Sequence, residues 1–453
     1  MDVHSILPII AKLKSEQYDI FASIIYTCLS YRNKSVSLFR RQFLVGLAHF
    51  RKSWAPLAVP LFRRIWLATF LSNVGTWMHE VASAWLMTSL TRSPIMIALM
   101  QTATYLPILV IGIPAGAIAD LNDRRHIVLF GQAWMLAAAA ILGVLTIQGL
   151  ITPWLLLALT LLMGMGAAAT VPAFGVLTQE LVKPQQVHAA LAINSSGRHV
   201  ARGIGSALGG ITLAIAGAGT VFLINAVSFA AILIVLFLWC LSTPAKSQDG
   251  GPLLAAIREG FAYTLKSKTL LSTHLLTALF GLSSSAVWAL LPLFAREDVG
   301  LTPFQYGLAM STFGLGSLFG VSALAWLRRL FSSNGATAAG VTIMACSLAG
   351  LAGSRKILDV LVAMGIAGVA WIIVVSSLNT HLQRNSDEWV RSRSVAIFAT
   401  IWQLNLAFGS FLWGVLAQKT NLRLTLYASA LALAVTALIF ARSQLFKPGK
   451  NGG

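Results

Sequence analysis

Ionisable side chains inside otherwise apolar stretches are the residues of this sequence that could do chemistry. His79 and Glu80 stand within the stretch 62–86, and imidazole and carboxyl groups are the usual carriers of protons in proteins. A second acid, Asp120, stands in the stretch 107–126, directly after its apolar part and shortly before a pair of arginines. Proton exchange and reversible ion pairing are the chemistries that these residues suggest, and both depend on what the apolar stretches are.

Composition identifies the apolar stretches as membrane-spanning. Of the 453 residues, 57% are hydrophobic and 10% are charged, whereas soluble domains carry about 25% charged residues. The net charge of +19 could favour nucleic acid, but the basic residues gather in short segments between apolar stretches, as membrane topology requires. The three isolated cysteines show no metal-ligand or disulfide spacing. We therefore expect a lipid-embedded protein without a metal, a cofactor or a nucleic-acid partner.

Twelve stretches are long enough to cross a bilayer, which takes about 20 residues. The longest interior connection, 242–268, separates them into two sets of six. We predict an all-α integral membrane fold of two pseudo-symmetric six-helix bundles, 61–241 and 269–442. Residues 1–60 are predicted to be a basic extension, either an amphipathic segment on the membrane surface or a poorly ordered tail, and 443–453 a cytoplasmic tail. The stretches are 62–86, 95–119, 126–148, 153–177, 193–216, 220–241, 269–293, 304–327, 336–353, 357–380, 394–417 and 423–442.

The distribution of lysine and arginine predicts the orientation, because cytoplasmic loops are enriched in these residues. With both termini inside, 27 of the 33 basic residues fall in inner segments. The six that fall outside are Arg92, Arg296, Arg355, Lys356, Lys419 and Arg423. We therefore predict a multi-pass protein of the plasma membrane with both termini in the cytoplasm.

The turn after the second stretch has a specific spacing. Gly116-x-x-x-Asp120-x-x-x-Arg124-Arg125 resembles the signature turn between helices 2 and 3 of major facilitator superfamily transporters, although Leu121 and Asp123 depart from the usual pattern. The glycine and arginine pattern recurs 204 residues later without the acid, as expected for two parallel halves that rock about a midplane site.

A carboxylate in the last turn of a helix is disfavoured by the helix dipole unless it has a partner. The N-terminus of the span 394–417 is the partner that we expect for Asp120, and the alternative is an ordinary cytoplasmic turn capped by arginines. The proposed inner latch consists of Gly116, Asp120, Arg124, Arg125 and Arg393.

The first span is unusually polar, and ionisable residues within a span normally face a cavity and have a function. Glu80 is the candidate for proton coupling, with His79 beside it. The alternative places both at the outer interface as solvated residues.

Polar and aromatic residues of other spans are candidates for a substrate cavity. Gln101 and Tyr105 share one helix face, where a helix–helix hydrogen bond is the alternative. Arg202 is equally consistent with substrate contact and with ion pairing, whereas for Arg198 we expect a structural role. A lone buried histidine such as His274 more often forms a helix–helix contact than a coupling site. The cavity candidates are Asn73, Trp77, Gln101, Tyr105, Arg202, His274, Trp288, Trp402 and Asn405, and Asn379 and Gln403 are further polar residues of the same spans.

The fifth span contains the small-residue segment Gly205-Ser206-Ala207-Leu208-Gly209-Gly210. It is similar to the helix-5 motif of antiporters of the superfamily, with Ser206 in the usual place of proline. Small residues allow helix backbones to approach closely in lipid. Gly205, Gly209 and Gly210 are therefore predicted to pack at the boundary between the halves, or to serve generic helix packing.

Together these segments resemble one branch of the superfamily, the transmembrane secretion effectors, which includes enterobactin-type siderophore exporters and macrolide or multidrug efflux proteins. The resemblance covers about residues 57–442 and implies a monomeric secondary exporter, a proton antiporter, that moves a small amphipathic molecule out of a bacterial cytoplasm. The proton gradient would be its driving force. An importer or lipid-type flippase on the same fold, and a membrane-embedded sensor or enzyme, are the alternatives.

Overall fold

Helices make up the regular structure of the described residues. The computed structural model describes residues 54–121, 123–242, 262–387 and 390–442, and at 113–121, 172, 176, 178–179, 240–242, 333 and 392 it describes the backbone alone. The chain divides into two compact units, Met1–Ala55 and Pro56–Gly453, and everything below concerns the second. Most of the predicted extension, most of the central loop and the C-terminal tail lie outside the described residues, so the predicted domain boundaries stay predictions.

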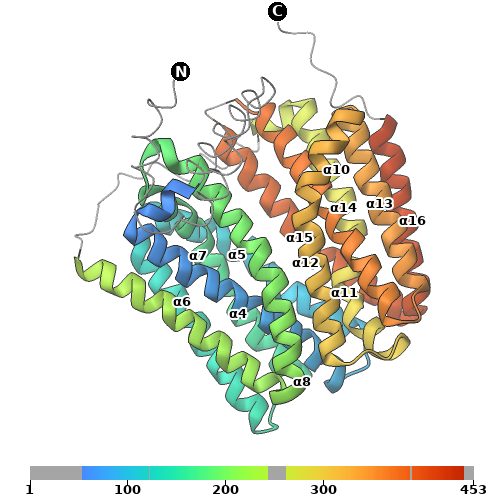
Figure 1. Ribbon diagram of the computed structural model, residues 1–453, viewed down its shortest axis with the longest axis horizontal. Helices are drawn as coiled ribbons and strands as arrows, with labels where there is room; N and C mark the ends of the chain where they lie inside the picture. Colours follow the sequence, from blue (N-terminus) through green and yellow to red (C-terminus); the bar gives the residue numbers. More distant parts are fainter. Residues whose placement is uncertain (1–53, 122, 243–261, 388–389, 443–453) are drawn as a thin grey trace, which may run out of the picture. The chain divides into compact units, whose positions relative to one another are not determined.

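The helices fall into two groups within the second unit, coloured blue to green and yellow to red in Figure 1. The N-terminal half consists of α4 (Pro60–Leu90), α5 (Pro94–Leu121), α6 (Arg124–Ile147), α7 (Pro153–Glu180) and α8 (Val187–Ser242). The C-terminal half consists of α10 (Lys268–Ser284), α11 (Ala286–Leu293), the π-helical turn η4 (Phe294–Asp298), α12 (Pro303–Leu330), α13 (Ser333–Gly353), α14 (Ile357–Arg384), α15 (Arg391–Lys419) and α16 (Leu422–Arg442).

The predicted spans agree with these helices. Ten helical segments of the described residues are long and apolar enough to cross a membrane. One of them, α8, is 56 residues long and is interrupted at Gly217, whose φ of 77° is readily adopted by glycine. This break lies between the predicted spans 193–216 and 220–241. With α8 counted as two arms, and with the more polar 31-residue α4, the described helices account for the twelve predicted spans.

Helix starts follow local sequence signals. Thr152 accepts a hydrogen bond from the backbone N–H of Leu155 and precedes a proline at the first helical position of α7. Thr302 forms a reciprocal capping box with Gln305 at the start of α12, again before a proline. Threonine caps and first-turn prolines satisfy or remove the unpaired N–H groups of a helix start.

The two halves meet mainly along two pairs of helices, α8 with α12 and α5 with α15. Glycines bring the backbones of α8 and α12 into contact, since a Cβ at Gly307 would lie 2.6 Å from the Cα of Gly210. At the same boundary Ser311 Oγ donates to the carbonyl of Gly203 at 2.7 Å. Between α5 and α15, Thr102 Oγ1 donates to the carbonyl of Ala407 at 2.7 Å.

These contacts lie toward one end of the helices, which carries the connections 91–93, 148–152, 299–302, 354–356 and 420–421. We call it the closed end. Here Ser93 Oγ donates to Gln418 Oε1 at 3.0 Å, and Arg92 of the N-terminal half lies 3.9 Å from the carboxylate of Glu297. Hydrogen bonds between the halves in which both partners are described lie on this side of the molecule. The opposite end carries the connections 122–123, 181–186, 331–332 and 385–390.

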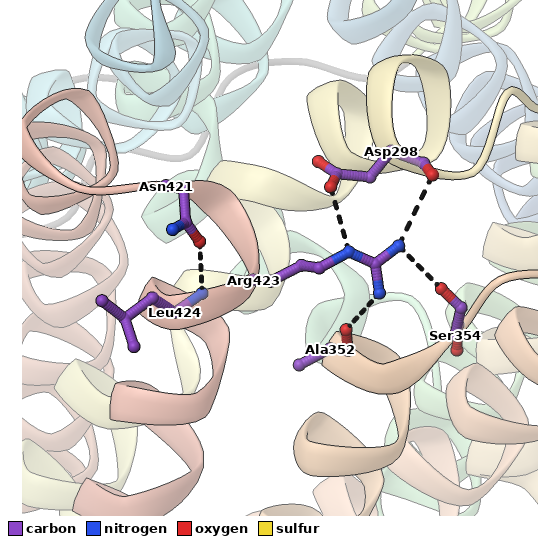
Figure 2. A network of polar contacts seen from close by, with 6 residues as sticks. All are labelled: Asp298, Ala352, Ser354, Asn421, Arg423 and Leu424. Carbon is purple, nitrogen blue, oxygen red and sulfur yellow. Dashed lines mark hydrogen bonds and ion pairs between the residues drawn. The ribbon is translucent and has the colours of Figure 1, made fainter.

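Arg423 fixes the C-terminal half at the closed end (Figure 2). Its Nε donates to Asp298 Oδ1 at 3.1 Å, and its Nη atoms donate to the carbonyls of Ala352 at 2.8 Å and Ser354 at 3.1 Å. Beside it, Asn421 Oδ1 accepts from the N–H of Leu424 at 2.8 Å and caps α16. One guanidinium thus joins η4, the end of α13 and the start of α16.

Candidate functional site

A cavity of about 370 Å³ lies where the two halves meet. We call it the central cavity. Its wall comes from α4, α5 and α8 of one half and from α11, α12, α14 and α15 of the other, so neither half forms it alone. Seven residues proposed from the sequence line it: Trp77, Glu80, Gln101, Tyr105, Arg202, Trp288 and Trp402.

Arg202 is surrounded by aromatic rings. Its guanidinium carbon lies 4.3 Å from the ring centres of Trp77, Trp288 and Phe313, and the residue is 8% exposed. Desolvated cation–π contacts of this kind are worth about 2 kcal/mol or more. Because Trp77 belongs to α4 and the other two rings belong to the C-terminal half, the side chain of Arg202 joins the halves as well as lining the cavity.

Trp371 of α14 is the centre of an aromatic cluster in the wall of the C-terminal half. Its ring centre lies 5.5 Å from that of Trp288 and 5.0 Å from that of Trp402, both nearly perpendicular to it. The ring centre of Phe280 lies 6.0 Å from those of both Trp371 and Trp402. Edge-to-face packing holds these rings in place, so this wall presents rigid apolar surfaces to the cavity.

Several polar atoms in the wall have no hydrogen-bond partner among the described residues. They are Trp288 Nε1, Gln403 Oε1 and Arg202 Nε. A buried polar atom without a partner costs about 1–3 kcal/mol. Two donors and one acceptor are therefore available to a bound molecule.

The sequence analysis did not select Tyr306, Met310 or Trp371, which also line the central cavity. Tyr306 is 2% exposed, and its ring centre lies 5.4 Å from that of Trp85 across the boundary between the halves. A tyrosine one turn into a span has the sequence signature of an interfacial anchor, so no local signal separates it from lipid-facing residues. Arg198, which we expected to have a structural role, lines the cavity as well.

A second cavity, of about 500 Å³, lies inside the N-terminal half. We call it the N-half cavity. Asn73 and His79 line this cavity and not the central one, while Trp77, Glu80, Tyr105 and Arg198 line both. Glu80 therefore stands in the wall that separates the two cavities.

Two cavity candidates line neither cavity. His274 is 4% exposed, and both ring nitrogens lack a partner among the described residues. Asn405 packs against Gly281, since a Cβ added at Gly281 would lie 2.8 Å from the Cβ of Asn405. The Nδ2 of Asn405 lies 3.5 Å from the carbonyl of Thr277. Both contribute to the interior of the C-terminal half.

The helix-5 glycines serve two different contacts. A Cβ at Gly205 would lie 2.5 Å from the carbonyl oxygen of Val74, and one at Gly209 would lie 2.8 Å from the Cα of Met78. These two glycines pack against α4, within the N-terminal half. Only Gly210 packs at the boundary between the halves, against Gly307.

The proposed latch can be described only in part, because the structure describes the backbone but not the side chain of Asp120. Gly116 and Asp120 belong to the last turns of α5, and Arg393 belongs to the first turn of α15. Arg124 donates to Glu180 Oε1 at 2.6 Å, and Arg125 lies 4.3 Å from the ring centre of Trp239. These two arginines thus join the start of α6 to α7 and α8.

Known proteins resemble this chain in amino-acid sequence. The sequence matches the family described as transmembrane secretion effector over residues 51–451. It is 28% identical to an uncharacterised MFS-type transporter, YfiS, of Bacillus subtilis, over 69% of this chain and 75% of that protein. It is 23% identical to the multidrug efflux pump Tap of Mycolicibacterium fortuitum, over 87% and 96%, and 25% identical to the staphyloferrin A transporter of Staphylococcus aureus, over 57% and 65%.

Solved structures share the fold. A bacterial homologue of the human lysosomal transporter Spinster superposes with a TM-score of 0.68 at 15% identity, covering 85% of this chain and 98% of that one. The nucleoside transporter NupG superposes with a TM-score of 0.67 at 13% identity, covering 86% and 100%.

Proposed function

Because this chain belongs to the transmembrane secretion effector family, and is a membrane transporter and not an enzyme, we propose that it exports a small amphipathic molecule from the cytoplasm by proton antiport. The observation that carries this proposal is the central cavity, which is built from both halves and contains the carboxyl group of Glu80 among aromatic rings. A site at the boundary of two repeated halves suits a mechanism in which the halves rock about the bound molecule.

The wall of the central cavity favours an amphipathic cargo. Its volume of about 370 Å³ lies within the range of small-molecule sites, about 300–1,000 Å³. The rings of Trp288, Trp371 and Trp402 offer flat apolar surfaces, and the unpartnered atoms offer a few hydrogen bonds. Relatives named for multidrug efflux and for staphyloferrin A support a drug or a siderophore as the cargo.

Glu80 is the proposed coupling residue. It is the one carboxyl group among the described residues that line the central cavity. A carboxyl group next to the cargo site can bind a proton in one state and release it in the other, so that proton entry is exchanged for cargo exit. The proton gradient is the proposed driving force.

The basic residues support an orientation in which the closed end faces outward. Arg92, Arg296 and Arg423 lie at that end, and most other lysines and arginines fall in segments assigned to the inside. In this proposal both termini are cytoplasmic, the protein is a monomer in the bacterial inner membrane, and the structure is a state closed to the outside.

Efflux measurements in whole cells test the proposal. A panel of amphipathic dyes, macrolides and siderophores is measured with and without an uncoupler in wild type, Glu80→Gln and Glu297→Gln. Glu297 lies outside the central cavity, 3.9 Å from the exposed Arg92, so its amide is the matched control. We expect wild type and the control to lower accumulation only with an intact gradient, and Glu80→Gln to lose this effect. Raised accumulation would indicate an importer instead, and indifference to the uncoupler would rule out proton antiport.

A further inference from the structure

The N-half cavity has a polar lining that the proposed cargo site does not use. It is lined by α4, α5, α6, α7 and α8, and thus by one half alone. It runs past Ser83 and Thr160 on one side of Glu80 and toward Trp66, Phe174 and Asn194 on the other. These last three lie near the ends of their helices that carry the connections 122–123 and 181–186.

Hydroxyl groups line this cavity with their acceptor lone pairs available. Thr69, Thr76, Thr104 and Thr160 each donate to the carbonyl four residues earlier in their own helix, at 2.7 to 2.9 Å. A hydroxyl that donates to its helix keeps lone pairs that can accept a hydrogen bond from water. The cavity thus presents a series of acceptors along its length.

Two buried side chains of the lining lack a partner among the described residues. His79 is 5% exposed, its ring packs on Phe222 at 4.7 Å, and its Nδ1 has no hydrogen bond. Gln132 of α6 is 7% exposed, and its Oε1 has none. Buried polar groups in a roomy cavity are ordinarily satisfied by water. Both atoms therefore indicate a hydrated interior.

We propose that the N-half cavity is a water-filled proton pathway from Glu80, separate from the central cavity that holds the cargo. This inference rests on the proposed proton antiport. In this state Glu80 would release its proton toward the end with the connections 122–123 and 181–186, along waters held by His79, Gln132 and the threonine hydroxyls. Cargo and protons then meet Glu80 on opposite sides of one wall.

Other charged or titratable groups surround Glu80 in this wall. His79 precedes it on α4, Tyr105 comes from α5, Arg198 and Arg202 come from α8, and Tyr306 comes from α12. The linings contributed by α6, α7 and α11 contain no titratable side chain among the described residues. Since the neighbours include two arginines and no second acid, Glu80 is the acidic group of the pathway.

Thiol labelling tests the hydration directly. In a chain whose natural cysteines are replaced, Ser83→Cys places a thiol in the N-half cavity, and Ser347→Cys places one at a site that lines neither cavity. The two serines are 3% and 5% exposed, so the pair is matched in residue type and burial. The probe is 2-(trimethylammonium)ethyl methanethiosulfonate, whose fixed charge keeps it from crossing lipid, and it is applied to inside-out vesicles.

We expect Ser83→Cys to react at least about tenfold faster than Ser347→Cys, because the reacting thiolate needs water around it. Equal rates at the two positions would overturn the proposal. Preference for the opposite vesicle face would overturn the direction of the pathway.

Transport measurements test proton release from Glu80. We expect Gln132→Leu combined with Thr160→Val to slow gradient-driven efflux at least about tenfold, and to leave exchange of labelled for unlabelled cargo within about twofold. Gln101→Leu, in the central cavity, should slow both. If wild-type efflux ignores an uncoupler, the proposed function fails and the proton pathway fails with it. If wild type responds but the double variant retains gradient-driven efflux, the pathway alone is wrong.

Discussion

Arg296 of the C-terminal half donates a hydrogen bond from Nη1 to the hydroxyl of Ser89 in the N-terminal half. The same Nη1 lies 3.2 Å from Thr88 Oγ1, and the guanidinium carbon lies 5.5 Å from the ring centre of Trp85. Two residues later, Asp298 is held by Arg423 (Figure 2). The turn η4 is thus fixed to its own half and reaches across to the other.

Arg296→Ala should loosen the closed end. Hydrogen bonds to charged groups contribute about 1.5–3 kcal/mol, so their loss should raise the population open at this end about tenfold or more. Spin labels at Leu150→Cys and Lys356→Cys, in connections of opposite halves, measure the separation. We expect a longer component in the distance distribution of the variant.

Arg92→Ala is the control for this experiment. The side chain of Arg92 is 87% exposed and lies 3.9 Å from Glu297, and exposed pairs contribute little. Its distribution should match that of wild type. If the distance distribution of Arg296→Ala also matched that of wild type, Arg296 would not hold the closed end together.

Gly307→Ala should destabilise the boundary between α8 and α12. The added Cβ would lie 2.6 Å from the Cα of Gly210, so one backbone must move. We expect a lower Tm than for Gly350→Ala, at a helical site where a Cβ meets nothing within 4 Å and where alanine favours the helix. Both are measured in detergent by fluorescence-detected unfolding. Equal Tm values would show that the two backbones are not in close contact.

Arg202→Lys should impair transport although it keeps the positive charge. Lysine lacks the planar guanidinium that lies between Trp77, Trp288 and Phe313. We expect efflux to fall about tenfold, whereas Arg64→Lys, an exposed arginine near the start of α4, should retain wild-type efflux. Full activity of Arg202→Lys would mean that charge alone is required there.

Asp120→Asn tests the latch proposed from the sequence. If the carboxylate pairs with the start of α15 in one state, its amide should shift the balance of states by about tenfold, at unchanged expression. The same spin-labelled pair reports the shift. Asp359→Asn, at the third residue of α14, is the control, since an amide oxygen can also accept from the backbone N–H groups of Arg355 and Lys356. Unchanged populations and unchanged efflux in Asp120→Asn would exclude the latch.

Much of the fold could be predicted because each span is a local signal. The break in α8 follows from Gly217 and its small neighbours, and the starts of α7 and α12 follow from Thr-Pro pairs. The intramembrane polar residues Glu80 and Arg202 could be selected since charge within lipid is costly wherever it occurs.

The sequence did not predict which residues come together in the wall of the central cavity. Trp371 and Tyr306 are ordinary aromatic residues in their own helices, and only the packing of α12 and α14 brings them beside Trp288 and Trp85. The sequence indicated Asn73 and His79 as polar residues of a span. It did not predict a separate N-half cavity, because a threonine that donates to its own helix has the same sequence pattern whether it faces a cavity or a neighbouring helix. Gly205 and Gly210 show the same limit, since one motif packs against two different helices.

The glycine contact between α8 and α12 also bears on how cargo range can change during evolution. Gly203, Gly210, Gly307 and Gly314 meet backbone to backbone, so at these four positions no side chain has to change its rotamer when the two helices change their crossing angle. Movement at this contact does not depend on which molecule is carried. Substitutions that broaden or redirect the choice of cargo should therefore accumulate in the aromatic wall around Trp371, whereas these four glycines should tolerate almost no substitution.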